Sequence, residues 1–314
     1  MNPIERIPIG STGVEVTRLG LGLAPIGGLY SPVSAEQAYA TVERGWDLGI
    51  RYFDVAPLYG NGLTESRAGH VLSRKKRSDF ALSTKVGRLL RPGGGEDQGI
   101  WAEAADVSPV FDFSASGVVT SYEESLARLG LDSADIVHLH DPDDHWAAAS
   151  AEALPQLVKM RAEGRIGAVS AGMNQAAMLA GFVRTGQLDS VLLAGRYTLL
   201  DRSGADELLP LCLSRGVSVI AAGVFNSGLL ADPSPDATFD YAPVDRETLD
   251  RALAMQRICA GYRVPLRAAA LQFPFRHPAI TCVLVGVRSP DEVEDAVKMA
   301  TLPIPEALWK DLDA

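Results

Sequence analysis

The feature that most constrains the fold is a regular alternation of two kinds of segment along the whole chain. Short apolar runs of the kind that form buried strands alternate with longer segments of helical periodicity. Strands are expected at residues 19–23, 52–55, 80–85, 135–139, 166–171, 190–193, 217–221 and 281–285. Helices are expected at residues 34–48, 64–73, 114–129, 147–162, 175–184, 205–214, 246–260 and 266–273, with closing helices at 290–299 and 305–312. This alternation predicts an α/β protein built as a single (β/α)8 barrel.

Residues 1–314 are expected to form one barrel domain, because no linker and no shift in composition divides them. An N-terminal β-hairpin at residues 7–16 is expected to plug one end of the barrel. The alternative is an open, doubly wound sheet, which would carry a glycine-rich phosphate-binding turn after the first strand. The segment 20–27 does not provide that turn, because Pro25 interrupts it and no helix is expected there.

Composition excludes some classes of partner. The net charge of −10 argues against nucleic acid, because proteins that bind nucleic acid carry basic patches. No signal-like start and no run of 18 apolar residues is found, so we expect no membrane partner and a cytoplasmic location. Cys212, Cys259 and Cys282 lack metal-binding spacing and are expected to be buried thiols. We expect a monomer or a weak homo-oligomer.

Four polar, titratable residues follow or end successive strands in the first half of the chain. Asp54 ends one strand, Tyr59 lies in the loop that follows, and Lys85 and His140 end the next two strands. Each alone has an ordinary interpretation as a turn or surface residue. Because an α/β barrel builds its active site at the carboxyl ends of its strands, the joint pattern predicts a catalytic site.

The chemistry expected of this group is proton transfer. A lysine beside a tyrosine favours the phenolate, and an aspartate paired with the lysine fixes its position. A tyrosine tuned in this way can exchange a proton with a substrate oxygen near neutral pH.

A second interpretation concerns His138 and His140, whose side chains point to the same side of one strand. Such a pair also occurs in metal-dependent hydrolases. Further ligands could come from Asp141, Asp143, Asp144 and His145. Pro142 and the loop are expected to carry these acids away, and no other strand end offers a histidine to complete the ligand shell, so we predict no metal site. His138 is expected to be a core histidine whose hydrogen bonds are satisfied.

The segments Phe53–Gly60, Ser83–Val86, Ile136–His140, Gly167–Asn174 and Val285–Pro290 resemble the aldo-keto reductases along essentially the whole chain. Within that family, the segments 86–90, 110–114, 140–143 and 226–230 look most like the bacterial sugar dehydrogenase branch. That branch includes L-fucose and D-threo-aldose 1-dehydrogenases and relatives that oxidise pyridoxal. The resemblance implies a catalytic tetrad, with Tyr59 as the acid/base, Lys85 and Asp54 as its tuning pair and His140 orienting the substrate oxygen.

The resemblance also implies a nicotinamide cofactor and the residues that contact it. These are Asp54, Asn174, Gly223, Phe225, Asn226, Ser227, Gly286, Arg288 and Glu292. Well-studied family members present a lysine and an arginine to the 2′-phosphate of NADPH, and this chain has Gly286 and Glu292 at the matching positions. A glutamate repels a phosphate but accepts hydrogen bonds from a ribose 2′-hydroxyl. We therefore expect NAD, with NADP as the alternative if Arg288 binds the phosphate. Ala194 and Ala222 replace a glutamine and a tyrosine that often contact the nicotinamide.

These observations together predict an NAD(P)-dependent oxidoreductase that acts on a small sugar or aldehyde. The expected reaction is oxidation of the C1 hydroxyl of an aldose, such as L-fucose or a D-threo-aldose, to the lactone. Trp101, in the Gly- and Pro-rich loop 87–112, is expected to contact the substrate together with Tyr59 and His140. The alternatives are a pyridoxal 4-dehydrogenase, an NADPH-linked aldehyde or ketone reductase, and a redox-sensing subunit with slow turnover.

Overall fold

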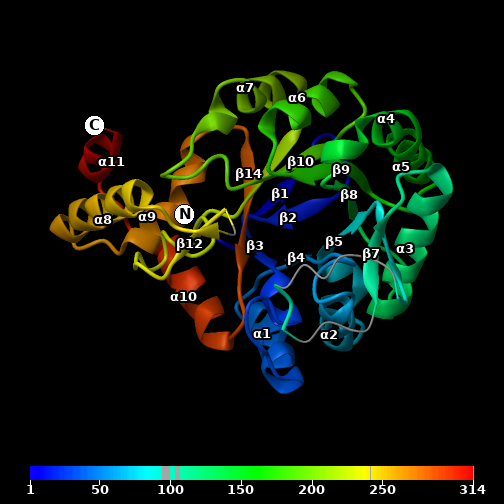
Figure 1. Ribbon diagram of the computed structural model, residues 1–314, viewed down its shortest axis with the longest axis horizontal. Coiled ribbons are helices and arrows are strands. Elements are labelled where there is room, and N and C mark those ends of the chain that lie inside the picture. The colour runs from blue at the N-terminus through cyan, green and yellow to red at the C-terminus, as the bar shows by residue number, and fades with distance from the viewer. Residues whose placement is uncertain (94–99, 103–106, 241, 314) are drawn as a thin grey trace.

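The structure is a computed structural model that describes residues 1–93, 100–102, 107–240 and 242–313 of the chain. Its centre is a closed barrel of parallel strands, each paired with the next in sequence (Figure 1). The strands are β3 (Leu19–Gly22), β4 (Tyr52–Asp54), β5 (Ala81–Val86), β8 (Ile136–His140), β9 (Ala168–Met173), β10 (Ser190–Ala194), β11 (Ser218–Ala222) and β14 (Ile280–Gly286). The expected (β/α)8 barrel is therefore confirmed.

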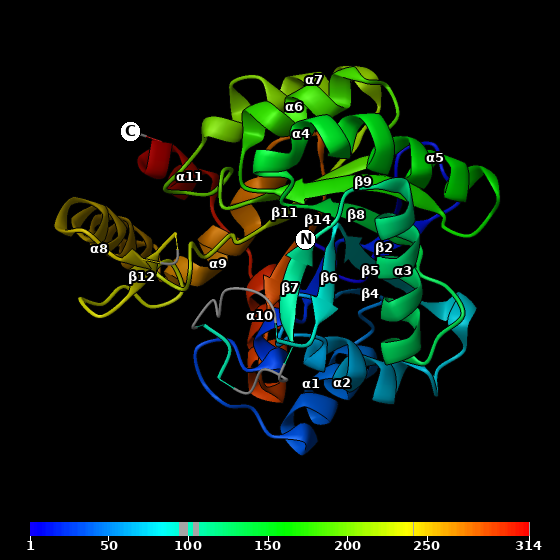
Figure 2. The same cartoon turned by 45° about the vertical axis from the view of Figure 1, so that its right-hand side comes forward.

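Helices surround the barrel, and α8 and α11 lie at the edge of the molecule, outside the ring (Figures 1 and 2). They are α1 (Ala35–Asp47), α2 (Leu63–Leu72), α3 (Ala115–Leu129), α4 (Trp146–Ala148), α5 (Leu154–Ala162), α6 (Ala176–Arg184), α7 (Leu208–Arg215), α8 (Arg246–Gly261), α9 (Leu266–Gln272), α10 (Pro290–Thr301) and α11 (Glu306–Asp313). A π-helical turn, Ala149–Ala153, joins α4 to α5 within the helix expected at 147–162.

The ends of the helices follow from local chemistry. The Ser34 hydroxyl accepts a hydrogen bond of 3.1 Å from the backbone N–H of Gln37, so α1 begins at the expected capping residue. Gly130 ends α3 in the left-handed conformation, with φ 62°, which a glycine adopts without a steric penalty. No helix within the described ranges is both long enough and apolar enough to span a membrane.

The N-terminal hairpin closes one end of the barrel, as expected. Its strands are β1 (Arg6–Pro8) and β2 (Glu15–Thr17). Ile9 and Val16 are fully buried and belong to the same apolar cluster as the first residues of four barrel strands, Tyr52, Ala81, Ile136 and Ala168. This packing closes the amino end of the barrel. The carboxyl end of the strands stays available for a binding site.

The segment after β5 was expected to be an irregular loop, and that expectation is wrong for its two ends. Two strands, β6 (Arg88–Arg91) and β7 (Ser108–Phe111), pair as an antiparallel ribbon beside the barrel (Figure 2). Residues 94–99 and 103–106 of this segment lie outside the described residues. A short 3-10 helix, Ala24–Gly27, also follows β3, where no helix was expected. A second small ribbon is formed by β12 (Thr238–Phe239) and β13 (Ala242–Pro243).

The three cysteines are buried free thiols, as expected. Burial raises the pKa of Cys212 to about 12 and that of Cys259 to about 11. Cys282 lies in β14 and faces the apolar interior of the barrel, where burial also raises its pKa.

Candidate active site

The four predicted catalytic side chains come together at the carboxyl end of the barrel. Lys85 donates through Nζ to Asp54 Oδ2 at 2.6 Å and to the carbonyl oxygen of Val55 at 3.0 Å. The same Nζ lies 4.7 Å from the centroid of the Tyr59 ring. The rings of Tyr59 and His140 are nearly perpendicular, with centroids 5.8 Å apart. The structure therefore places a buried ion pair and a histidine next to one phenol.

A chain of hydrogen bonds behind the ion pair holds Asp54 in place. Ser83 donates through its hydroxyl to Asp54 Oδ1 at 2.6 Å, and the Ser83 hydroxyl lies 3.0 Å from the hydroxyl of Tyr52. Burial raises the pKa of Tyr52 well above its ordinary value, so its phenol stays protonated. Both carboxylate oxygens of Asp54 are thus engaged, and Lys85 has little freedom to leave the Tyr59 ring.

His140 is neutral in this environment. Burial lowers the pKa of His140 well below its usual range, and the nearby cations Arg88 and Lys85 lower it further. Its Nε2 lies 3.4 Å from Asp141 Oδ2. A neutral imidazole can donate one hydrogen bond and accept another, which is what positioning a substrate hydroxyl or carbonyl requires.

His138 lies one layer below the four residues and departs from the prediction. It is fully buried, as expected, but neither ring nitrogen has a hydrogen-bond partner among the described residues. Its Nε2 is 3.8 Å from Asp54 Oδ1, which already accepts from Ser83. The prediction of satisfied hydrogen bonds is therefore wrong. Burial, followed by the charge of Lys85, lowers the pKa of His138 well below its usual range.

The metal interpretation of His138 and His140 finds no further ligands. Across the ranges that the structure describes, no three His, Cys, Asp or Glu side chains are grouped so that they could hold a metal ion.

Two cavities meet at Tyr59. The first has a volume of about 960 Å³ and the second about 570 Å³, both within the usual range for ligand pockets. Residues that line both are Ala24, Leu29, Tyr59, Leu192 and Ala194. A group bound in one cavity can therefore contact a group bound in the other at the Tyr59 side chain.

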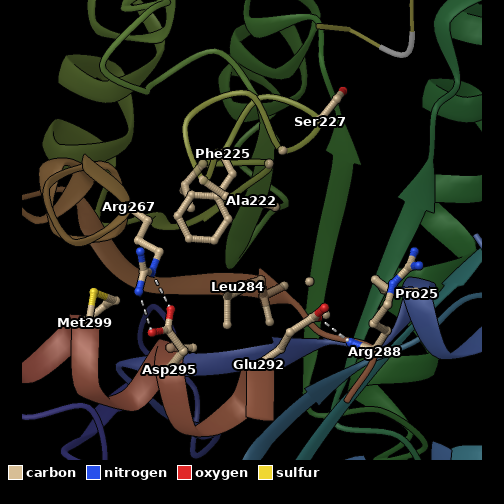
Figure 3. A pocket seen from close by; sticks show the side chains of 18 of the residues that line it. Pro25, Ala222, Phe225, Ser227, Arg267, Leu284, Arg288, Glu292, Asp295 and Met299 are labelled. Atoms are coloured by element: carbon tan, nitrogen blue, oxygen red, sulfur yellow. Dashed lines mark hydrogen bonds and ion pairs between the residues drawn. The ribbon is translucent and has the colours of Figure 1, made fainter. Parts of the chain in front are cut away.

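The first cavity contains most of the residues that the sequence predicts to bind the cofactor. Those that line it are Asp54, Gly223, Phe225, Ser227, Gly286, Arg288 and Glu292. Figure 3 shows Phe225 and Ala222 across the cavity from Glu292 and Asp295. Asp291 and Glu292, in the first turn of α10, also line this cavity, and their carboxylates can accept hydrogen bonds from a ligand.

Two of the predicted cofactor ligands lie elsewhere. Asn174 lines the second cavity. Asn226 is buried, and its Nδ2 donates to the carbonyl oxygen of Gly195 at 3.3 Å, so its amide supports the backbone of the neighbouring turn. Their contacts with a cofactor stay predictions.

Arg288 and Glu292 are joined, but not through their charged groups. The backbone N–H of Arg288 donates to Glu292 Oε2 at 2.8 Å. The Arg288 guanidinium instead donates to the carbonyl oxygen of Leu29 at 2.8 Å and to the hydroxyl of Ser31. Its hydrogen bonds thus go to the loop after β3 and not to Glu292, so both the Arg288 guanidinium and the Glu292 carboxylate remain charged groups that line the cavity (Figure 3).

Sequence analysis missed an ion pair across the first cavity. Arg267 in α9 and Asp295 in α10 form two hydrogen bonds of 2.7 and 2.9 Å, which tie the two helices together (Figure 3). Both residues line the cavity. The spacing of 28 residues between them carries no sequence signal, because the pairing depends on how α9 and α10 pack.

The second cavity is lined by the predicted substrate residues Tyr59, His140 and Trp101. The Trp101 ring lies 5.9 Å from the Tyr59 ring, centroid to centroid, and residue 101 forms an antiparallel bridge with Leu29. Arg88, Asp141 and Asp143 also line this cavity, and sequence analysis did not single them out as substrate residues. Arg88 could have been recognised as a candidate, because it is a charged residue within an apolar run directly after a barrel strand.

Comparison with known proteins agrees with this geometry. The model of the aldo/keto reductase family matches residues 18–314. A pyridoxal 4-dehydrogenase from Microbacterium luteolum is 41% identical over 98% of this chain and 96% of that protein. A D-threo-aldose 1-dehydrogenase from a Pseudomonas species is 40% identical over 96% of this chain and 94% of that protein. The solved structure of a glycerol dehydrogenase from Gluconobacter oxydans has a TM-score of 0.81 at 22% identity, covers 100% of this chain and 95% of its own, and shows the shared fold. The chain is thus an oxidoreductase enzyme, and it belongs to the aldo/keto reductase family.

Proposed function

We propose that the protein oxidises the C1 hydroxyl of an aldose to a lactone, with NAD as the hydride acceptor. The observation that carries this proposal is the position of Tyr59 where the two cavities meet, beside the buried Lys85–Asp54 pair. The volumes of the two cavities, about 960 Å³ and about 570 Å³, support a dinucleotide in the first and a sugar in the second. The similarity to a D-threo-aldose 1-dehydrogenase supports the choice of substrate.

In the proposed reaction, Tyr59 accepts the proton of the C1 hydroxyl. The Lys85 ammonium near its ring favours the phenolate, and Asp54 holds that ammonium in place. The neutral His140 orients the C1 oxygen by a hydrogen bond. A nicotinamide bound in the first cavity would supply the redox chemistry as hydride acceptor, and the products would be the lactone, the reduced cofactor and one proton.

The proposed preference for NAD rests on Glu292. NADP carries an additional phosphate of nearly two negative charges on the ribose 2′-oxygen. Two like charges about 4 Å apart repel by about 1 to 4 kcal/mol between water-like and surface-like dielectric. The guanidinium of Arg288, whose hydrogen bonds go to Leu29 and Ser31, offers that phosphate less compensation than a free arginine.

Titration of the pure protein with NAD and NADP tests this preference. We expect NAD to bind roughly ten- to a thousandfold more tightly. Glu292→Arg should narrow or reverse that ratio, most clearly at low salt. Glu294→Arg is the matched control, because Glu294 lies on the same helix and pairs with Arg44. Tighter binding of NADP to the unmodified protein would overturn the cofactor proposal and favour a carbonyl reductase.

Pyridoxal oxidation is the second candidate, favoured by the 41% identity to a pyridoxal 4-dehydrogenase. Turnover with NAD should be compared for L-fucose, other neutral aldoses and pyridoxal. A higher kcat/KM for pyridoxal than for every aldose would select this alternative.

A further inference from the structure

Buried polar atoms without partners gather around the second cavity. Among the described residues, Arg88 Nε, Trp101 Nε1, His140 Nδ1 and Asp143 Oδ1 are buried and have no hydrogen-bond partner, and all four residues line this cavity. Leaving such an atom unpaired is costly, so buried polar groups in native proteins are paired by protein, water or ligand. Their concentration at one cavity points to a ligand that presents both acceptors and donors.

Three charged residues that line the cavity form a group next to His140, whose Nε2 lies 3.4 Å from Asp141 Oδ2. The Arg88 side chain is only 8% exposed, and its Nη2 donates to Asp141 Oδ2 at 2.7 Å. The Arg88 guanidinium also lies 4.8 Å from the centroid of the Phe111 ring. Asp141 has a φ of 42°, which is unusual for a residue other than glycine and is the kind of backbone strain that occurs at binding sites. We call Arg88, Asp141 and Asp143 the distal cluster.

The charges of the distal cluster restrict the ligand. One guanidinium is set against two carboxylates, and the other cation lining the cavity, Lys85, is already paired with Asp54. The cluster therefore has a formal charge of −1, which disfavours an anionic ligand. A hydroxyl group is both a donor and an acceptor, so a ligand with several hydroxyls can donate to Asp143 and accept from Arg88.

We propose that the distal cluster recognises the ring hydroxyls of a neutral, unphosphorylated sugar while its C1 hydroxyl lies at Tyr59 and His140. This inference rests on the proposed function and adds the substrate class and the residues that select it. Arg88 and Asp143 are specificity residues in this proposal, and Asp141 positions Arg88. Uronates and sugar phosphates are rejected because their charge meets the unpaired carboxylate of Asp143.

The test compares a sugar with an analogue that keeps C1 but lacks the ring hydroxyls. The analogue is 2-hydroxytetrahydropyran, a cyclic hemiacetal whose oxidation gives a lactone. The sugar is the best substrate in a panel of neutral pentoses and hexoses that includes L-fucose, and the panel also contains the uronates of the hexoses. The readout is the ratio of kcat/KM for the sugar to kcat/KM for the analogue.

Asp143→Asn and Arg88→Gln should each lower this ratio by roughly ten- to a hundredfold, as expected for the loss of a hydrogen bond to a charged group. The analogue should lose far less, and each uronate should be at least about tenfold poorer than its neutral parent in the unmodified protein. Asp144→Asn and Arg91→Gln are matched controls. Asp144 is the exposed neighbour of Asp143, and Arg91 lies on the same strand as Arg88 and pairs with Glu124.

The outcomes separate this inference from the proposed function. The inference is overturned if Asp143→Asn leaves the sugar-to-analogue ratio of kcat/KM unchanged while the unmodified protein oxidises the sugar. The proposed function then still stands. Equal loss on both substrates assigns the distal cluster a structural role and also overturns it. If the unmodified protein oxidises neither the analogue nor any aldose with either cofactor, the proposed function itself fails.

Discussion

At the scale of single residues, the proposed proton transfer depends on the Tyr59 hydroxyl. Tyr59→Phe should lower turnover by about 10² to 10⁴, because a positioned acid or base contributes that much. The dissociation constant for NAD should change little, because the phenyl ring keeps its contacts with the cavity walls. Initial rates and a fluorescence titration measure the two quantities. Tyr39→Phe is the control, since Tyr39 stacks on His70 away from both cavities. Turnover like that of the unmodified protein would refute the role of Tyr59.

The sequence predicts the position of Tyr59, Lys85 and His140, because these residues follow strands and the strands of a barrel end at one rim. It does not predict the distal cluster, because that cluster is recognised by the polar atoms that lack hydrogen-bond partners in the folded structure. The same limit explains His138. A strand pattern shows that the residue is buried, but only the packed structure shows that Ser83 already occupies the nearby oxygen of Asp54.

At the scale of elements, one short loop joins the two cavities. Residues 28–31 follow the 3-10 helix after β3. The guanidinium of Arg288 holds this loop from the side of β14 and α10. On the other side, the backbone N–H of Tyr30 donates to the carbonyl oxygen of Ile100 at 2.7 Å, and that of Ala102 donates to the carbonyl oxygen of Gly28 at 2.9 Å. Arg288 thus supports Leu29, which lines both cavities.

This arrangement predicts a specific effect of Arg288→Ala. Binding of NAD and of NADP should weaken by a similar factor, from a few-fold to about tenfold, because the loop loses hydrogen bonds to the guanidinium. Their ratio should stay the same. Calorimetric titration of both cofactors measures this, and Arg288→Lys should retain part of the affinity. A selective loss of NADP binding would show instead that Arg288 binds the 2′-phosphate.

The ribbon of β6 and β7 shows where element prediction from the sequence fails. Each strand has four residues, too few to establish an alternating pattern, and β7 contains Pro109, which argues against a strand. The pairing of Leu89 with Val110 joins residues separated by a long Gly- and Pro-rich segment. The barrel strands and helices, in contrast, carry repeated patterns and clear caps, and these elements were predicted to within a few residues.

At the scale of the whole molecule, the two buried histidines predict a loss of stability in mild acid. The pKa values of His138 and His140 are well below 6.5 in the folded protein, so an unfolded chain binds more protons below that pH. The two histidines therefore leave the free energy of unfolding unreduced above pH 6.5. Below that pH the free energy of unfolding decreases by about 1.4 kcal/mol per histidine per pH unit. Asp141, whose pKa burial raises, acts in the opposite direction.

Urea unfolding at pH 7.5 and 5.5 measures this dependence. His138→Phe removes one of the two groups, so it should reduce the pH dependence even if it changes the absolute stability. His70→Phe is the matched control, because His70 is exposed and stacks on Tyr39, away from the two buried histidines. Equal stability at the two pH values in the unmodified protein would mean that the histidines take up protons while folded.

The three buried cysteines also make the unfolding of the barrel chemically observable. Only the thiolate reacts with an alkylating reagent, so buried thiols of raised pKa react when the structure around them opens. Cys259 lies in α8 at the edge of the molecule, Cys212 in α7 of the outer layer, and Cys282 in the central strand layer (Figure 1). We expect alkylation, followed by mass spectrometry, to proceed in that order under native conditions. Reversal of the order would mean that the barrel strands separate before the peripheral helices detach.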